Sequence, residues 1–249
     1  MPRMETNSNS SVLLVQAFSS DVLIELLRKS LDKLSSNSQP RYALLPEYCC
    51  ASPYNKEIFV GLLTSLCEIS SLYPSTMICT SLLNDSATCG VARRNTAVVF
   101  ERGQYECIYN KIEDDGLAFY DPDQSLLNRQ RFDRQFQDQS RPVVSVCMDL
   151  GLARARFQQH SNPNATRTWL IPAMAGTLDP SQSSQVPFAN GMMCFSNGKR
   201  DGISPSCCIF YSAVLSAPQM HTLPNNEEQA VLFRPGAANF FQVVSSVRV

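Results

Sequence analysis

Histidine is scarce in this 249-residue chain, which contains only His160 and His221. Both lie in polar surroundings, and neither a Ser-His-Asp triad nor a zinc site can be assembled from so few ligands. The segment GISPS at residues 202–206 is similar to a nucleophile elbow, but it lacks the second glycine and a histidine partner. Glycine-rich phosphate loops are also absent from the sequence. We therefore expect no metal and no cofactor.

An excess of charge and a long apolar run are missing as well. Lysine and arginine total 21 against 22 acidic residues, and the net charge of −1 gives no field to recruit nucleic acid or an anionic membrane. Apolar runs such as residues 77–83 are far shorter than the ~20 residues of a membrane span, and residues 1–11 contain no apolar signal core. The composition predicts a soluble, cytoplasmic protein whose partner is a small molecule.

The ten cysteines show no disulfide framework. They occur singly or as the adjacent pairs Cys49/Cys50 and Cys207/Cys208, without the spacing typical of small secreted domains. We interpret them as reduced thiols that lie mostly in the core.

The chain does contain enough apolar sequence for one large core. Hydrophobic residues make up 44% of it and no linker interrupts it, so we predict a flexible polar tail at residues 1–11 and a single domain at residues 12–249. Helices are expected from a cap at Asp21 to about Leu34 and from Lys56 to about Leu72. Strands are expected at residues 12–15, 42–45, 77–83, 96–100, 104–112, 142–147, 168–172, 192–197, 207–214 and 231–233. This order of elements favours an α/β fold.

The sequence turns polar between Glu113 and Arg141, with repeated Gln, Asp and Arg. We predict a long surface excursion there that supplies pocket walls. Its arginines are interpreted as a solvated face, with the alternative that one of them contacts a substrate carboxylate; they are Arg129, Arg131 and Arg134.

Three strings place a reactive side chain where an apolar run gives way to polar residues. They are LLPEY around Glu47, YNKIE around Lys111 and VVSVCMD around Cys147. Cys147 would lie at a strand-to-helix turn, where backbone N–H groups and a helix N-terminus favour a thiolate and can hold an oxyanion. The ends of apolar strands are also where α/β sheets place their sites.

An acid, a cation and a thiol are the parts of a nucleophilic site that attacks a carbon bonded to nitrogen. An ammonium from Lys111 would raise the thiolate fraction and stabilise a tetrahedral intermediate. Glu47, in a mostly apolar neighbourhood, would have a raised pKa and act as the base. Each residue alone is more typical of an ordinary core or surface position, and the hypothesis depends on all three lying at the C-terminal ends of apolar runs.

Around these strings the chain resembles the carbon–nitrogen hydrolases, the nitrilase superfamily of amidases, nitrilases and carbamoyl hydrolases. The similarity begins at VLLVQ (residues 12–16) and continues through LLPE and MICTSLL to RRNTAVVFERGQYECIYNKI, with Asn95 and Gly103 in register. VCMD, WLIPAMAG and FSNGKRDGIS follow, so that the resemblance covers roughly residues 12–235. The order and spacing of these motifs, more than any one of them, are specific to the family.

The resemblance implies a four-layer αββα sandwich of two mixed β-sheets flanked by helices, and a homodimer. It also implies Glu47 as general base, Lys111 as oxyanion-stabilising cation and Cys147 as the nucleophile that forms a thioester, with the backbone N–H of Met148 joining Lys111. The substrate would be a small amide, carbamoyl compound or nitrile, and family frequencies favour an amide. The residues expected in its pocket are Tyr48, Glu113, Asp149, Pro172 and Ala173.

Departures from the family pattern leave alternatives open. Many members carry a second glutamate between the lysine and the cysteine, whereas only Glu113 lies in that interval here, so its role is missing or passes to Asp121 or Asp123. One alternative is therefore a catalytically inactive protein of this fold that binds a ligand or partner. An isochorismatase-like hydrolase ranks lower, because its first strand ends in an aspartate and this one ends in Gln16.

Overall fold

A computed structural model of the chain describes residues 11–34, 38–47, 56–84, 94–112, 122–160, 166–173, 190–198, 205–213, 215–235 and 239–247. The tail expected at residues 1–11 lies outside this part except for Ser11, and the predicted pocket residues Tyr48 and Glu113 lie outside it entirely.

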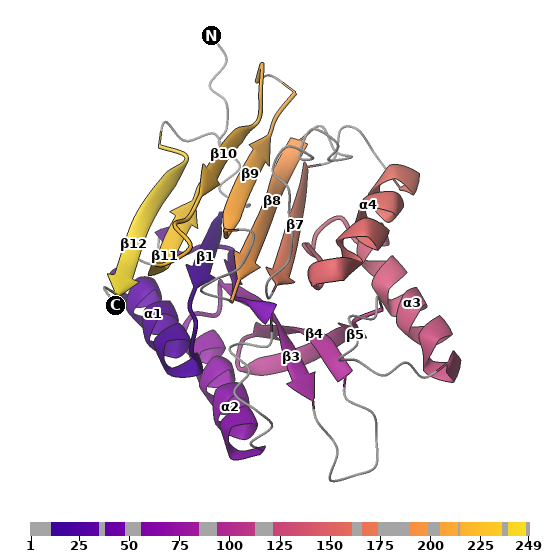
Figure 1. Cartoon of the computed structure of the whole chain (residues 1–249), viewed down its shortest axis with the longest axis horizontal. Helices are drawn as coiled ribbons and strands as arrows, with labels where there is room; N and C mark the ends of the chain where they lie inside the picture. Colours follow the sequence, from indigo (N-terminus) through magenta and orange to yellow (C-terminus); the bar gives the residue numbers. More distant parts are fainter. Residues whose placement is uncertain are drawn as a thin grey trace.

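The described strands form two mixed sheets. The seven-stranded sheet has the order β12-β11-β1-β2-β3-β4-β5, in which β1, β2 and β3 are parallel and the other pairings are antiparallel. Its strands are β1 (Val12–Gln16), β2 (Tyr42–Leu44), β3 (Met77–Asn84), β4 (Arg94–Glu101), β5 (Gln104–Asn110), β11 (Glu228–Phe233) and β12 (Phe241–Val247). Figure 1 shows β3, β4 and β5 of this sheet below the second sheet, and β12 to its left.

The second sheet has five strands in the order β10-β9-β8-β7-β6, with β6, β7 and β8 parallel. Its strands are β6 (Val143–Val144), β7 (Thr166–Ala173), β8 (Asn190–Asn197), β9 (Cys207–Tyr211) and β10 (Gln219–Thr222). The hydroxyl of Ser196 in β8 donates to the carbonyl of Val15 in β1 at 2.7 Å, and so joins the inner faces of the two sheets.

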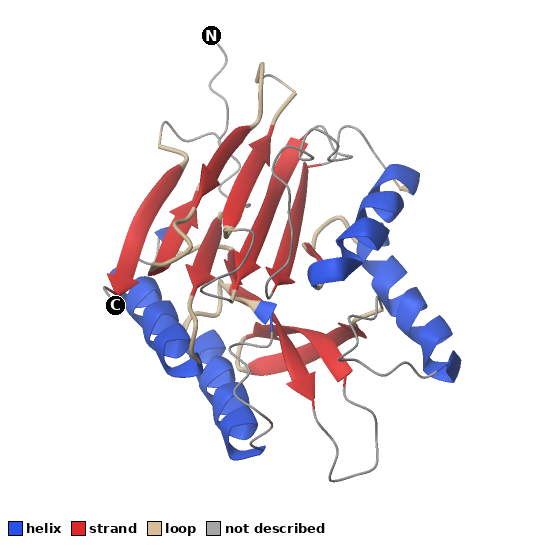
Figure 2. Ribbon diagram, in the orientation of Figure 1, coloured by secondary structure: helices blue, strands red, loops and turns tan. Residues whose placement is uncertain are grey.

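Helices cover both sides of this pair of sheets (Figure 2). Helices α1 (Ser20–Lys33) and α2 (Lys56–Leu72) bury leucines such as Leu26 and Leu66 against the outer face of the seven-stranded sheet. Helices α3 (Pro122–Gln137) and α4 (Leu150–Gln159) pack on the side of β5, β6 and β7, where Phe157 of α4 meets Trp169 of β7 with ring centroids 5.0 Å apart. The predicted four-layer αββα architecture is confirmed.

Most of the predicted elements are present, and several local expectations are wrong. Helix α1 begins two residues earlier than expected because the side chain of Ser19, not Asp21, accepts a hydrogen bond from the backbone N–H of Val22. The excursion predicted between Glu113 and Arg141 contains the 16-residue helix α3. Strands β10 and β12 were not predicted, and the strand expected at residues 142–147 is reduced to the two residues of β6.

The hairpin between β4 and β5 has the expected tight turn. Arg102 and Gly103 occupy its two central positions with φ of 53° and 80°, the left-handed backbone that two-residue hairpin turns require. The backbone N–H of Gly103 donates to the hydroxyl of Ser70 at 2.9 Å, which fixes the hairpin on helix α2.

The cysteines that the structure describes are free thiols. Cys79, Cys194, Cys207 and Cys208 are buried, Cys67 and Cys147 are partly buried, and Cys107 is exposed. None of the described helices combines the length and the apolar character needed to cross a lipid bilayer.

Candidate active site

Three elements bring the predicted acid, cation and thiol together. Glu47 follows β2, Lys111 follows β5 and Cys147 follows β6, so the first two come from the seven-stranded sheet and the third from the five-stranded sheet. The ammonium of Lys111 donates to Oε1 of Glu47 at 3.1 Å, and the thiol of Cys147 also donates a hydrogen bond to the Glu47 carboxylate. One carboxylate therefore contacts both other groups.

The pair formed by Glu47 and Lys111 is deeply buried, with 1% of each side chain exposed. Burial raises the pKa of Glu47 above its ordinary value, whereas the positive charge of Lys111 and the hydrogen bonds from Lys111, Cys147 and Asn95 act to lower it. Because burial is the larger effect, the carboxylate holds a proton more tightly than a solvated glutamate does. This is the property that a general base needs near neutral pH.

Asn95 in β4 is a further contact of this carboxylate. Its side-chain amide donates to Oε1 of Glu47 at 2.6 Å, and its backbone carbonyl accepts from the N–H of Lys111 at 2.7 Å. Asn95 therefore positions both members of the ion pair. The sequence contains a signal for this contact. If the two strands of the hairpin are paired residue by residue from the turn at Gly103, Asn95 falls opposite the end of β5.

Cys147 lies at a sharp turn between β6 and α4. Its φ is 43°, a left-handed conformation that residues with a side chain rarely adopt, and residues Cys147–Asp149 form a single 3-10 turn before α4 begins at Leu150. A strained strand-to-helix turn of this kind directs the side chain out of the strand and leaves the following N–H groups near the sulfur. The thiol is partly exposed.

A buried network ties this turn to the end of β5. Asp149 is 0% exposed, and its carboxylate accepts hydrogen bonds from the hydroxyl of Tyr109 at 2.9 Å and from the N–H of Ile112 at 3.1 and 3.2 Å. The same Tyr109 hydroxyl accepts from the N–H of Val146 at 2.7 Å. Residues on both sides of Lys111 are thus bound to residues on both sides of Cys147. No local sequence pattern indicates this role for Tyr109, because the link exists only in the folded chain.

No protein-family model and no curated protein matches this sequence. Solved structures of the amidase from Nesterenkonia sp. AN1 do match it. A double variant in complex with acrylamide has 14% identity and a TM-score of 0.60, over 96% of this chain and 94% of that one. Another, with acrylamide added to its active-site cysteine, has 13% identity and a TM-score of 0.57 over 90% and 92%. A cysteine-to-serine variant, described as from the nitrilase superfamily, has 14% identity and a TM-score of 0.54 over 89% and 94%.

The chain has the nitrilase-superfamily fold. Within this fold the parallel strands β6, β7 and β8 end at one edge, and there Gly198 follows β8. A side-chain carbon at Gly198 would lie 2.8 Å from Cβ of Pro46, the residue before Glu47, so only glycine lets the two sheets approach this closely beside the site.

The other residues predicted to line the pocket lie in different parts of this fold. Pro172 and Ala173 are buried at the end of β7, at the same edge as Cys147. Met148 lies in the 3-10 turn directly after Cys147. Asp149, also predicted in the pocket, is instead enclosed by its bonds to Tyr109 and Ile112. In the described part of the chain, no group of three or more His, Cys, Asp and Glu side chains is placed to hold a metal ion.

Proposed function

We propose that this protein is a thiol hydrolase that cleaves a carbon–nitrogen bond in a small non-peptide amide, with carbamoyl compounds and nitriles as the related alternatives. The observation that carries the proposal is the single buried carboxylate of Glu47 in contact with the Cys147 thiol and the Lys111 ammonium. The likeness to amidases whose active-site cysteine adds to acrylamide supports the reaction class.

In the first half of the reaction, Glu47 accepts the proton of the Cys147 thiol as the sulfur attacks the carbonyl carbon. The carbonyl π electrons move to oxygen and form a tetrahedral oxyanion. The Lys111 ammonium and the backbone N–H of Met148 stabilise that charge, and in a dry site such stabilisation is worth several kcal/mol, on the order of 10²–10³-fold in rate for one donor.

In the second half, protonated Glu47 gives its proton to the departing nitrogen, the carbon–nitrogen bond breaks, and a thioester on Cys147 remains. A water molecule then loses a proton to Glu47 and attacks the thioester. Collapse of that intermediate releases the carboxylic acid, and Glu47 returns the proton to the sulfur. Two of these steps need a carboxyl group that holds a proton well, which agrees with the raised pKa of Glu47.

Tyr109 and Asp149 act as positioning residues in this proposal. Through them the N–H of Val146 and the N–H of Ile112 are fixed to one buried pair of side chains. The distance between the sulfur and the ammonium therefore depends on a network that never touches the substrate. Nucleophilic attack tolerates little error in such distances.

The direct test measures ammonia release from a panel of small amides by purified protein and by Cys147→Ala. We expect the substitution to lower turnover by roughly 10³-fold or more while the far-UV circular dichroism spectrum stays unchanged, because the covalent route is lost. Iodoacetamide should label Cys147 before the other thiols. The matched control is Cys107→Ala, which removes an exposed thiol on β5 and should leave turnover intact.

Two results would contradict the proposal. Turnover that persists in Cys147→Ala would eliminate the thioester mechanism. Silence of the unmodified protein across amides, nitriles and carbamoyl compounds, with no difference from Glu47→Gln, would favour the ligand-binding alternative.

A further inference from the structure

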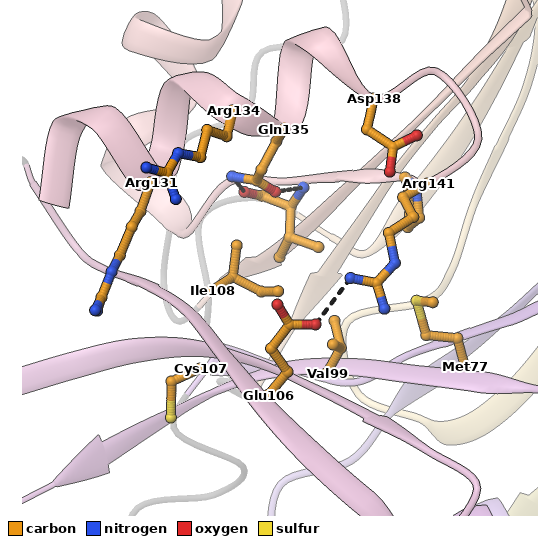
Figure 3. A pocket seen from close by; sticks show the side chains of 12 residues that line it. Met77, Val99, Glu106, Cys107, Ile108, Arg131, Arg134, Gln135, Asp138 and Arg141 are labelled. Atoms are coloured by element: carbon orange, nitrogen blue, oxygen red, sulfur yellow. Dashed lines mark hydrogen bonds and ion pairs between the residues drawn. The ribbon is translucent and has the colours of Figure 1, made fainter. Parts of the chain in front are cut away.

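A cavity of about 510 Å³ lies between α3 and strand β5, away from the proposed active site (Figure 3). Met77 at the start of β3 and Pro142 before β6 line it, so it lies toward the N-terminal ends of these two strands, whereas Cys147 follows the C-terminal end of β6. None of Glu47, Lys111 and Cys147 lines it. Its volume is within the range of about 300–1,000 Å³ that is typical of small-molecule sites.

One part of the cavity is apolar. Four strands and the segment before β6 contribute its side chains, which are Met77, Val99, Ile108, Val144 and Pro142. Such a surface favours a ligand with an apolar body, at roughly 25 cal/mol for each Å² removed from water.

The charged part of the cavity carries a local excess of positive charge. Arg131 and Arg134 are three residues apart on α3 and therefore lie on one face of the helix, and the sequence had predicted a solvated face for them. Within the described residues neither forms an ion pair. Figure 3 shows both on the helix side of the cavity, away from Asp138 and Arg141.

The acidic side chains that line the cavity, Glu106 and Asp138, already have partners at the end away from Arg131 and Arg134. Arg141 pairs with Glu106 at 2.8 Å and with Glu101 at 3.4 Å. The carboxylate of Asp138 accepts from the N–H and the hydroxyl of Ser140 at 2.9 and 2.7 Å. The two α3 guanidinium groups thus have no carboxylate of the described chain to neutralise them, and each can present paired N–H donors to an anion.

The walls of the cavity are preformed. The side chain of Gln135 accepts from the N–H of Val144 at 2.9 Å and donates to its carbonyl at 3.2 Å, which fixes α3 against β6. Phe132, on the same helix, packs edge-on against Tyr109 of β5 with centroids 4.9 Å apart. A site that is already ordered loses little entropy when a ligand binds.

We propose that this cavity binds a small amphipathic anion, such as a carboxylate on an aliphatic or aromatic body. The anionic head pairs with Arg131 and Arg134, and the body lies on the apolar surface formed by Val99, Ile108 and Val144. This site is separate from the proposed catalytic centre and does not depend on turnover there.

Cys107 provides a local reporter, because it lines the cavity and its side chain is exposed. The probe is octanoate, and the measurement is the rate of N-ethylmaleimide modification at each cysteine, followed by mass spectrometry of the peptides. We expect octanoate to slow modification of Cys107 severalfold, while Cys67, on helix α2 and outside the cavity, reacts at an unchanged rate. The readout at Cys107 also separates this site from any binding of octanoate beside Cys147.

Variants of α3 test the charged head group. In Arg131→Gln/Arg134→Gln the octanoate concentration for half protection should rise by about tenfold or more, because two charge-assisted contacts are lost. Arg129→Gln removes an exposed arginine of the same helix that does not line the cavity, and it should leave protection unchanged.

The class of ligand is tested with two further probes. Heptanol supplies a body without charge and inorganic phosphate supplies charge without a body, and we expect both to protect Cys107 more weakly than octanoate. Equal rates at Cys107 with and without octanoate would overturn the site. Equal protection by heptanol or by phosphate would overturn the amphipathic class.

Discussion

At Glu47, burial and hydrogen bonding act in opposite directions on one carboxyl group. Burial raises its pKa, and the donors around it, Lys111, Cys147 and Asn95, lower it. Asn95 is the donor that takes no part in the proposed chemistry, so it adjusts the base without reacting. Removing its amide should leave the burial effect less opposed.

The acid limb of the pH–rate profile tests this adjustment. The base must be ionised to accept the thiol proton, so kcat/KM should fall as the pH drops through a pKa above the ordinary 4.5 of a glutamate. Asn95→Ala removes a donor that stabilises the charged form, and the limb should therefore move to higher pH. In Thr96→Val, the neighbouring residue whose hydroxyl donates to Asn110, the limb should not move. A shift to lower pH in Asn95→Ala would contradict the assignment of Glu47 as the base.

The sequence predicted Glu47, Lys111 and Cys147 because each ends an apolar run, a property visible in a few neighbouring residues. The contacts of Asn95 and Tyr109 could not be read in that way. Tyr109 sits within β5 and reaches the Cys147 turn only because β6 comes alongside after helix α3. Its role depends on the distance between two sheets, which no local pattern encodes.

Helix α3 closes the same side of both sheets. Strand β5 is the edge of one sheet and β6 is the edge of the other, and α3 connects them along the chain. The Asn128 side chain accepts from the N–H of Asn110 at 2.7 Å and donates to its carbonyl at 2.5 Å, as Gln135 does with Val144. The two amides are seven residues apart, about 10.5 Å along a helix, which matches the ~10 Å between stacked sheets.

Each side-chain amide thus supplies the hydrogen bonds that a neighbouring strand would make at the sheet edge. These bonds predict an effect on stability. Asn128→Leu and Gln135→Leu should each lower the free energy of unfolding by about 1–3 kcal/mol, because a backbone N–H and a carbonyl lose their partner at a sheet edge. Urea unfolding measures the change. Gln130→Leu, an exposed position on the same helix, should have an effect within about 0.5 kcal/mol. Equal effects at all three positions would show that the amides do not close the edges.

The sequence did not reveal α3 because the helix is sparsely apolar. Among residues 126–137, whose side chains the structure describes, Phe132 and Phe136 are buried, and the residues around them are mostly Gln, Arg and Asp. Strands β10 and β12 were missed for a similar reason, since both lie at sheet edges and most of their side chains are exposed. Helices α1 and α2 and the central strands were predicted because burial there imposes a strict apolar period.

On the scale of the whole molecule, the described elements join the two sheets on the side opposite α3 by stacked rings and not by a helix. Strands β10 and β12 are the other edges of the two sheets, and the ring of His221 in β10 stacks on Phe241 in β12 with centroids 3.5 Å apart. Burial lowers the pKa of His221, so the folded protein favours the neutral ring. Protonation of His221 therefore opposes this ring contact between the two sheets.

This contact should make stability depend on pH. The unfolded chain binds a proton at His221 near its ordinary pKa of 6.5 and the folded chain only at lower pH, so stability is complete above 6.5 and decreases as the pH falls below it. His221→Phe keeps a stacked ring and should weaken this decrease when Tm is measured from pH 7.5 to 5.5, values chosen at about one unit on each side of the ordinary histidine pKa. His160→Phe, at an exposed position, is the control. An unchanged acid slope in His221→Phe would rule out this origin.

In the proposed mechanism the reacting groups come from different layers, so turnover would depend on how the two sheets are positioned relative to each other. Displacement of one sheet along the other by a single residue step, about 3.3 Å, would carry the Cys147 sulfur out of reach of its base while leaving every strand intact. Substitutions in the interior between the layers can therefore abolish activity without exposing the chain to proteases. Selection on turnover would then preserve packing far from any substrate.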